Sequence, residues 1–440
     1  MGSSVTHVSP STTRQRFYGK VLANRYLRHN MLLLGANILA GIFSYLLHPF
    51  LGHMMSIQEY GQVAALISLS LLLTTPTQVI GTVATKYASS LSSGSQLNDF
   101  IRRLTAILLA AGIVITVIFI AGSSYVAFFF HLNSQQGVML LGLMFIVLFV
   151  TPLNQGTLVG LQRFNWFATI MLLSSFLRLV LPIGFVLVGL SVNGAVFGIA
   201  LSALLAYLVS FQPLRGVLRG PRSPIGSLRS LWSYSILVSA AAGGIVFLGS
   251  SDTVLASHFL DARDVGLYAA LATIGRTIVF ITSSVTTIMF PTVVALYGRR
   301  EPHMRVVIGA MLGVLILSLT VESAFYLAPS LVTKLLFGRA FIAISGQLAL
   351  YGMAMLLLSV GMVIINYFLA IGNRSFVLII FLACALQTGL IVWHHAAIEE
   401  VVQAVLVTNA ALVFALLIAF GLSVRKTSAG PKTAPQEIRE

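Results

Sequence analysis

The stretch Ser250–Arg276, SSDTVLASHFLDARDVGLYAALATIGR, reveals how the chain is organised, because a fainter copy of it lies 205 residues earlier in the chain. The best match sets GLYAAL at 266–271 on GQVAAL at 61–66. An acid and a histidine match in the same register: Asp264 with Glu59, and His258 with His53. The chain is therefore predicted to consist of two related halves.

The composition excludes a soluble fold. Of the 440 residues, 58% are hydrophobic and only 8% are charged. Apolar runs of about 20 residues without alternation predict membrane-spanning helices rather than a barrel. The single cysteine, Cys384, rules out a disulfide framework within one chain. We expect an all-α polytopic membrane protein.

Twelve apolar segments are long enough to span a membrane, and the basic residues give their orientation. If the N-terminus is cytoplasmic, 21 of the 26 Lys and Arg fall on the inner side, as the positive-inside rule requires. We expect a multi-pass protein of the cell membrane with both termini in the cytoplasm. The net charge of +15 then reports topology and not nucleic-acid binding. The predicted spans are 30–51, 62–84, 104–129, 137–160, 167–190, 194–212, 233–256, 265–290, 305–328, 344–369, 375–394 and 400–423.

Six spans in each half place both halves in the membrane in the same direction, so the repeats are parallel and a central cavity lies between them. The first residues, 1–29, are predicted to be a cytoplasmic tail that either contains a short amphipathic helix on the lipid surface or merely orients the first span. The remaining predicted regions are an N-terminal lobe at 30–212, a basic cytoplasmic linker at 213–232, a C-terminal lobe at 233–425 and a cytoplasmic tail at 426–440.

Polar side chains recur on one face of several spans. Small residues on such stripes are explained by helix packing alone. Larger polar groups are costly against lipid, and we expect them to line the cavity and bind substrate. These candidates are Asn37 and His48 in the first span, Gln78 in the second and Thr273 in the eighth.

Four ionisable residues lie well inside predicted spans. Arg178 and Arg276 each lie about 16 Å from a span end, near the midplane, whereas Asp252 and Glu322 lie about 10 Å nearer the outer side. We therefore expect both guanidinium groups to lack an acid at their own depth and to bind a phosphate or pyrophosphate. The alternatives are that Arg276 tilts up to Glu322 or Asp252, or that Arg178 snorkels inward. Asp252 would otherwise be hydrated at the outer mouth, and Glu322 is a candidate ion or proton site.

Motifs of hydrolytic chemistry are missing from the sequence. It contains no Walker-type loop, HExxH or GxSxG. We read His394 and His395, with Glu399 and Glu400, as a solvated outer loop and assign no metal site. The prediction is a carrier that is not an enzyme and needs no cofactor, with coupling to a proton or sodium gradient as an option.

Short motifs along most of residues 30–425 also resemble a known family. The segment 45–66, with Glu59-Tyr60-Gly61, is similar to the first hairpin of bacterial polysaccharide (O-antigen type) flippases in the multidrug/oligosaccharidyl-lipid/polysaccharide superfamily. Ser251-Asp252-Thr253-Val254-Leu255 with 265–270 resembles the family's seventh and eighth spans, and Leu327-Ala328-Pro329 with 336–341 its outer connection between spans nine and ten. The family has no fixed catalytic residues to transfer to this chain.

The resemblance implies two six-helix lobes around a cavity and movement of an undecaprenyl-pyrophosphate-linked oligosaccharide from the inner to the outer leaflet by alternating access. The implied partners are this glycan lipid, membrane lipids and other polysaccharide-assembly proteins. Two alternatives stay open: a cation-coupled multidrug exporter of the same superfamily, and a membrane glycan polymerase or glycosyltransferase. The exporter would need acids at the centre of a lobe, and the enzyme a large outer loop, which the sequence lacks.

Overall fold

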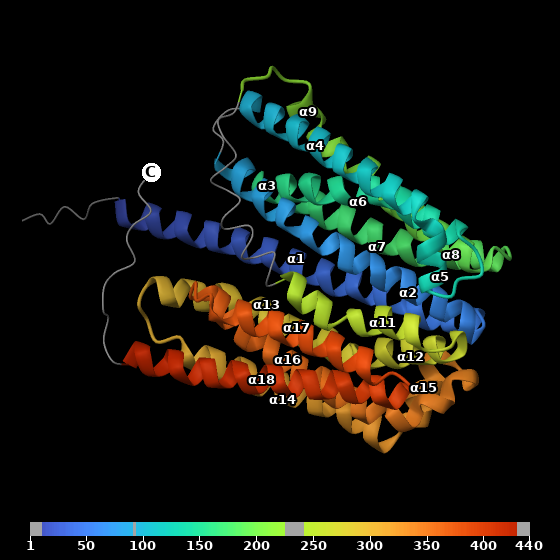
Figure 1. Cartoon of the computed structure of the whole chain (residues 1–440). Helices are drawn as coiled ribbons and strands as arrows, with labels where there is room; N and C mark the ends of the chain where they lie inside the picture. The colour runs from blue at the N-terminus through green and yellow to red at the C-terminus, as the bar shows by residue number, and fades with distance from the viewer. Residues whose placement is uncertain (1–10, 91–93, 225–241, 429–440) are drawn as a thin grey trace, which may run out of the picture.

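The computed structural model describes residues 11–90, 94–224 and 242–428, and every element in these ranges is a helix (Figure 1). In chain order they are α1 (Ser11–Met54), α2 (Ile57–Thr74), η1 (Thr75–Thr77), α3 (Gln78–Ser90), α4 (Gly94–Ala121), α5 (Ser123–Phe129), α6 (Gln136–Gly160), α7 (Phe164–Leu187), α8 (Ser191–Ser210), η2 (Gln212–Leu214), α9 (Arg215–Leu218), α11 (Ser251–Phe259), α12 (Ala262–Gly275), α13 (Thr277–Gly298), α14 (Met304–Leu327), α15 (Pro329–Phe337), η3 (Arg339–Gln347), α16 (Leu348–Ala370), α17 (Ser375–Trp393) and α18 (Ile398–Ser428).

The membrane spans agree with those predicted. Among the described residues, ten helices are long and apolar enough to cross a membrane, and α2 and α3, bent by 42° at their junction, count as an eleventh when taken together. These coincide with eleven of the twelve predicted spans. The other predicted span, 233–256, begins in residues 225–241, which lie outside the described ranges. The prediction of an all-α polytopic membrane protein is confirmed.

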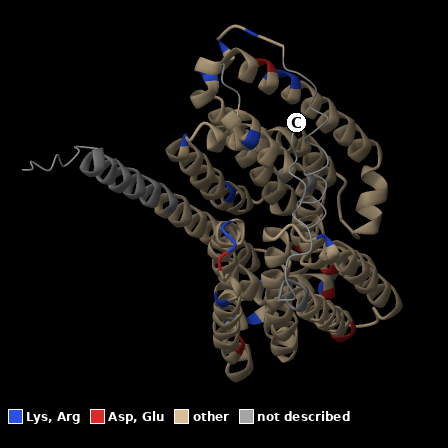
Figure 2. Ribbon diagram, turned by 90° about the vertical axis from the view of Figure 1, so that its left-hand side faces the viewer, with Lys and Arg blue, Asp and Glu red and all other residues tan. Residues whose placement is uncertain are grey.

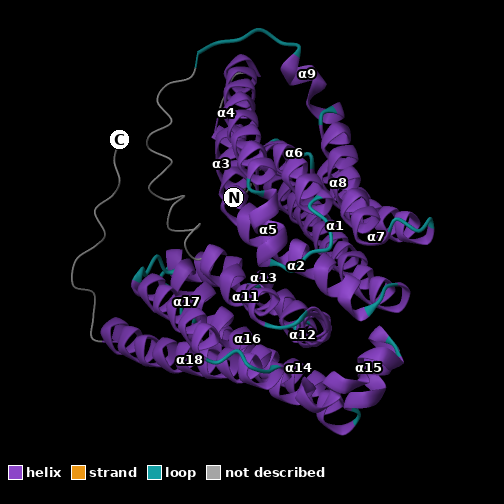
Figure 3. Cartoon of the chain, turned by 45° about the vertical axis from the view of Figure 1, so that its right-hand side comes forward, coloured by secondary structure: helices purple, strands orange, loops and turns teal. Residues whose placement is uncertain are grey.

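The helices form two bundles, which we call the N-lobe (α1–α9) and the C-lobe (α11–α18). In the N-lobe α1 and α8 pack along α7, and α4 packs along α6; in the C-lobe α16 packs along α13, α14 and α18. Figure 1 shows that the lobes converge where α2, α12 and α15 lie and diverge toward the other end, and the turned view in Figure 3 shows the same two bundles. We call these the converging and diverging ends.

Two predicted non-spanning regions are partly described. Helix α1 runs from Ser11 into the first span without a break, and the side chains of 11–30 lie outside the described set, so the amphipathic surface helix stays a prediction. The beginning of the predicted linker packs on the N-lobe, because Arg102 on α4 donates to the carbonyl oxygen of Leu218 at 2.7 Å. Figure 2, which views the molecule from the diverging end, shows how few charged residues the ribbon carries.

The two copies of the repeat cross each other where the lobes converge. Gly61 on α2 and Gly266 on α12 are equivalent in the repeat, and a Cβ on Gly61 would lie 2.7 Å from the backbone nitrogen of Gly266. A Cβ on Gly266 would in turn overlap the carbonyl oxygen of Ile57. Only glycine permits so close an approach of two backbones. The repeat found in the sequence thus forms one contact between the lobes.

The two helices of the crossing also begin in the same way. Ser56 caps α2 and Asp261 caps α12, and these residues are equivalent in the repeat. The Asp261 carboxylate accepts hydrogen bonds from the backbone of Arg263 and Asp264, at 3.0 and 2.8 Å. Side-chain caps of this kind satisfy backbone groups that the first turn leaves free. Both halves therefore start their crossing helix at the same point.

A second contact between the lobes lies at the same end. The ring of His258 on α11 stacks on Phe129 with centroids 4.1 Å apart, and its Nδ1 lies 3.2 Å from the carbonyl oxygen of Phe129. His131 reaches back to the carbonyl oxygen of Ser257 at 3.3 Å. The converging end is therefore held shut by packing as well as by the glycine crossing.

Candidate functional site

Asp252 is the centre of a buried polar cluster in the C-lobe. Its side chain is fully buried at the start of α11. Its Oδ2 accepts hydrogen bonds from Tyr268 at 2.9 Å and Tyr351 at 2.6 Å, while Oδ1 lies 2.6 Å from Arg276 Nη2. The backbone nitrogen of Thr253 donates to Oδ1 at 2.7 Å. A buried carboxylate is tolerated only with partners of this kind.

Arg276 lies at the break between α12 and α13, where the chain turns out of the first helix before it enters the second. Besides Asp252, its Nη2 contacts the hydroxyl of Thr253 at 2.7 Å. Its Nε is buried and has no hydrogen-bond partner among the described residues. A quarter of the side chain remains exposed. The guanidinium therefore keeps donors that its acid does not use.

The prediction that Arg276 lacks an acid at its own depth is wrong, and so is the expectation that Asp252 is hydrated at a mouth. Helix positions alone separate the two residues by about 10 Å along the axis. Side chains on a helix lean toward its N-terminus. Because α12 begins at the converging end and α11 finishes there, Arg276 leans toward that end and Asp252 leans away from it. The two side chains close the gap, as the alternative reading anticipated.

A second polar chain joins the lobes at the crossing. His48 Nδ1 on α1 lies 3.1 Å from the hydroxyl of Tyr60, and this hydroxyl lies 3.1 Å from Thr273 Oγ1 on α12. The Tyr60 ring is fully buried and packs edge-on against Phe337 and Phe341 of the C-lobe. Of the predicted binding residues, the structure thus brings His48 and Thr273 together through a tyrosine.

Arg178 has no hydrogen-bond or ion-pair partner among the described residues. It lies on α7, which packs along α1, and its Nε is buried with no hydrogen-bond partner in the described chain. Neither of the two ion pairs found in the described ranges includes it. Arg178 belongs to α7 of the N-lobe and Arg276 to the α12–α13 break of the C-lobe, so each lobe contributes one of the two arginines.

The other predicted residues lie apart from this centre. Asn37 is exposed on α1 and donates to the Leu33 carbonyl oxygen of its own helix at 3.0 Å. The backbone of Gln78 begins α3, and its side chain lies outside the described set. Glu322 on α14 is 8% exposed, its Oε2 has no partner among the described residues, and it lies against Gly352 of α16.

The residues that sequence reasoning missed are tyrosines. Tyr60, Tyr268 and Tyr351 are fully buried, and each hydroxyl makes a hydrogen bond. The partner is Thr273 for Tyr60 and Asp252 for the other two. In the sequence these tyrosines cannot be told from the apolar residues that pack around them. One property could have identified them, because a tyrosine hydroxyl inside a membrane span needs a hydrogen-bond partner.

The two arginines differ in how their charges are compensated. The Asp252 carboxylate balances the charge of Arg276, whereas no acid among the described residues pairs with Arg178. A planar guanidinium with free N–H groups matches phosphate oxygens. Within the described residues, no three His, Cys, Asp or Glu side chains gather in a way that could hold a metal ion.

Comparisons with known proteins identify a family and a fold. A family model described as "Polysaccharide biosynthesis protein" matches residues 27–297. No curated protein matches the chain. Among solved structures, the inward-facing conformation of a multidrug resistance MATE family transporter of the MOP superfamily has a TM-score of 0.74 at 16% identity, over 88% of this chain and 96% of that one.

Two further structures show the same fold. An outward-facing conformation of a MATE family transporter has a TM-score of 0.63 at 14% identity, over 92% of this chain and 97% of that one. A MOP superfamily transporter from Pyrococcus furiosus, described as having a binding pocket of reverse polarity, has a TM-score of 0.62 at 16% identity, over 92% and 96% of the two chains. At these identities the similarity concerns the fold.

Proposed function

Because the chain belongs to the polysaccharide biosynthesis protein family, we propose that it is a flippase for a polyprenyl-pyrophosphate-linked oligosaccharide. Family and fold both point to a membrane transporter rather than an enzyme. The proposed substrate joins a long apolar tail to a pyrophosphate and a polar glycan. A carrier with its polar site between two lobes can hold the pyrophosphate and the glycan while the apolar tail stays in lipid.

The observation that carries the proposal is the unpaired guanidinium of Arg178. A buried arginine without an acid is costly in a membrane unless a cavity or an anion compensates it. Arg276 contributes a second guanidinium with an unused Nε, from the other lobe. One donor from each lobe suits a group with two phosphates and links substrate binding to the separation of the lobes.

The proposed direction of transport, from the inner to the outer leaflet, rests on the basic residues. The positive-inside rule puts the diverging end in the cytoplasm and the converging end outside, in the cell membrane. In this orientation the glycine crossing closes the outer end, and the arginines are approached from the side on which the lipid-linked glycan is assembled. Other polysaccharide-assembly proteins would supply the substrate and receive it.

The pyrophosphate is tested by equilibrium binding. Arg178→Gln in lipid nanodiscs should bind a fluorescent short-chain polyprenyl-pyrophosphate sugar about 10- to 100-fold more weakly, since a hydrogen bond to a charged group contributes about 1.5–3 kcal/mol. Arg178→Lys, the matched control, keeps the charge but loses the planar fork and should be intermediate. Folding should survive, because no acid is left unpaired. Unchanged affinity in Arg178→Gln would rule out this anion site.

Glu322 is the proposed coupling site for a proton or sodium ion. It is a buried acid in a span, and one of its carboxylate oxygens is free. It lies against Gly352, which follows Tyr351, the tyrosine whose hydroxyl donates to Asp252. In liposomes with an imposed gradient, Glu322→Gln should bind substrate normally but lose the part of transport that depends on the gradient. Transport that responds to the gradient as in the native protein would contradict this role.

Glu322 is also the observation that favours a second candidate function, a cation-coupled multidrug exporter. Asp252 is engaged by Arg276 and the two tyrosines, so Glu322 is the acid that keeps an unused, buried oxygen within the described spans. Drug resistance that Glu322→Gln abolishes, in a protein that moves no glycan lipid, would favour the exporter.

A further inference from the structure

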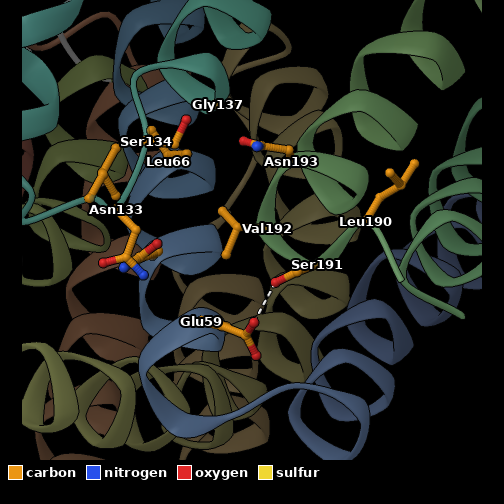
Figure 4. Close-up of a pocket in the computed structure, with 11 residues that line it drawn as sticks. Glu59, Leu66, Asn133, Ser134, Gly137, Leu190, Ser191, Val192 and Asn193 are labelled. Carbon is orange, nitrogen blue, oxygen red and sulfur yellow. Dashed lines mark hydrogen bonds between the residues drawn. The ribbon is translucent and has the colours of Figure 1, made fainter. Parts of the chain in front are cut away.

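A small polar pocket opens at the converging end of the N-lobe, and no arginine lines it (Figure 4). Its volume is about 140 Å³, and it lies between the start of α2, the loop before α6 and the turn into α8. Figure 4 shows Glu59, Asn133, Ser191 and Asn193 arranged around it. This volume corresponds to about five water molecules, which is room for a single small ring and not for a chain.

The pocket presents carboxamides whose hydrogen bonds are unused. Gln62 is 5% exposed, lines the pocket and has no hydrogen-bond partner in the described ranges. Its amide atoms are not among the enclosed polar atoms of the described residues, so they reach the open space of the pocket. Asn193 donates from Nδ2 to Gln136 at 2.9 Å, which leaves its Oδ1 free to accept, and Asn133 likewise has no partner in the described part of the chain.

The one acid of the pocket is already engaged. Glu59 accepts hydrogen bonds at 2.9 Å from both the backbone nitrogen and the hydroxyl of Ser56, and the hydroxyl of Ser191 donates to its other oxygen. Both carboxylate oxygens thus already accept hydrogen bonds from the protein itself. The free groups of the pocket are therefore neutral and can both donate and accept.

Apolar side chains complete the walls. Leu66, Leu132 and Val192 line the pocket beside the carboxamides. A sugar ring combines these two characters, because its hydroxyls lie around the rim and its C–H groups form an apolar face. Each hydroxyl is both donor and acceptor, which a carboxamide matches. An ion would contact only the polar side chains of the pocket, and a purely apolar ligand would contact only the apolar ones.

We propose that this pocket binds one neutral sugar unit at the outer end of the N-lobe. Given the proposed function, it is a subsite that receives the glycan as it leaves the centre, but binding of a free sugar does not depend on that role. Glu59 and Gln62 flank Gly61 of the crossing, so a sugar bound here contacts the helix whose separation from α12 opens the outer end.

The probes for the test are the methyl glycosides of glucose, galactose and N-acetylglucosamine, measured by saturation-transfer NMR on the protein in nanodiscs. At least one should bind saturably. Binding should weaken at least tenfold in Gln62→Leu, which keeps the size and removes the carboxamide, and in Asn133→Ala, an exposed position whose change does not threaten folding. Gly137→Leu should also block it, since a Cβ there meets only Leu66 and Asn193, at 3.4 and 3.6 Å.

Two controls make the result specific. Gln347→Leu removes a carboxamide at the converging end of the C-lobe and should leave sugar binding unchanged. Arg178→Gln should lose affinity for the lipid pyrophosphate while it keeps sugar binding, so failure of the flippase proposal is distinguishable from failure of this one. The pocket proposal is overturned if no glycoside binds saturably, if Gln347→Leu weakens binding as much as Gln62→Leu, or if anionic N-acetylneuraminic acid binds more tightly than the neutral sugars.

Discussion

The carboxylate of Asp252 and the guanidinium of Arg178 show two treatments of a buried charge. Asp252 has a salt bridge and two tyrosine hydroxyls, so the protein itself compensates the charge. Arg178 has no acid in the described residues, and its Nε has no acceptor there. The first arrangement stabilises the fold, whereas the second leaves a place for a ligand.

Asp252→Asn should be strongly destabilising. Removing one member of a buried ion pair leaves the other charge uncompensated, which costs about 3–5 kcal/mol. The double variant Asp252→Asn with Arg276→Gln removes both charges and should recover part of that loss. Thermal unfolding in detergent measures both. Two results would contradict the structural role of this pair. One is a single variant with the same unfolding temperature as the native protein, and the other is a double variant that is less stable than the single one.

At this scale the sequence predicted positions better than pairings. Charge inside a predicted span singled out Arg178, Arg276, Asp252 and Glu322. Spacing along straight helices, however, placed Arg276 and Asp252 too far apart. Their contact depends on the direction in which side chains lean, which needs the helix directions as well as the residue numbers. The three tyrosines carry no pattern that separates them from packing residues until their hydroxyl partners are known.

Among the elements, the crossing of α2 and α12 determines how the lobes meet. The repeat detected in the sequence supplies both helices, both caps and both glycines, because the two backbones must match to approach so closely. The polar link through Tyr60 and Thr273 lies on the same two helices. The contact that closes the converging end and the polar centre are therefore mechanically connected.

Gly266→Ala should open the converging end. The added Cβ would overlap backbone atoms of Ile57, which cannot rotate away as a side chain could. With Cys384 replaced by serine, spin labels on the exposed residues Gln135 and Lys334 report the separation of the lobes by pulsed electron resonance. The variant should shift the distance distribution to longer values.

The matched control is Gly184→Ala on α7, because a Cβ at that glycine meets nothing within 4 Å. Its distance distribution should equal that of the native protein. If Gly266→Ala also left the distribution unchanged, the glycine crossing would not be what holds this end shut.

Element ends were the less predictable part of the fold. Hydrophobic runs located the spans, since a membrane imposes length and apolarity directly. The break at Arg276 between α12 and α13 lies inside one apolar run and leaves no composition signal. The bend between α2 and α3 does have a signal in the sequence, which is Pro76.

The whole molecule is a pair of lobes that touch at one end and diverge at the other, with Arg178 in the N-lobe and Arg276 in the C-lobe. An anion bound by both would favour conformations that keep the lobes near each other around it, and its release would follow their rearrangement. We therefore propose that Arg178 and Arg276 bind the pyrophosphate of a lipid that crosses the membrane.

The most direct measurement of that claim is leaflet transfer in liposomes. A short-chain polyprenyl-pyrophosphate sugar is loaded into one leaflet, and its arrival in the other is followed with a membrane-impermeant glycan-binding probe. Native protein and Arg178→Lys should transfer the lipid, and Arg178→Gln should be slower by at least tenfold. Transfer by Arg178→Gln at the native rate, or no protein-dependent transfer at all, would contradict the account.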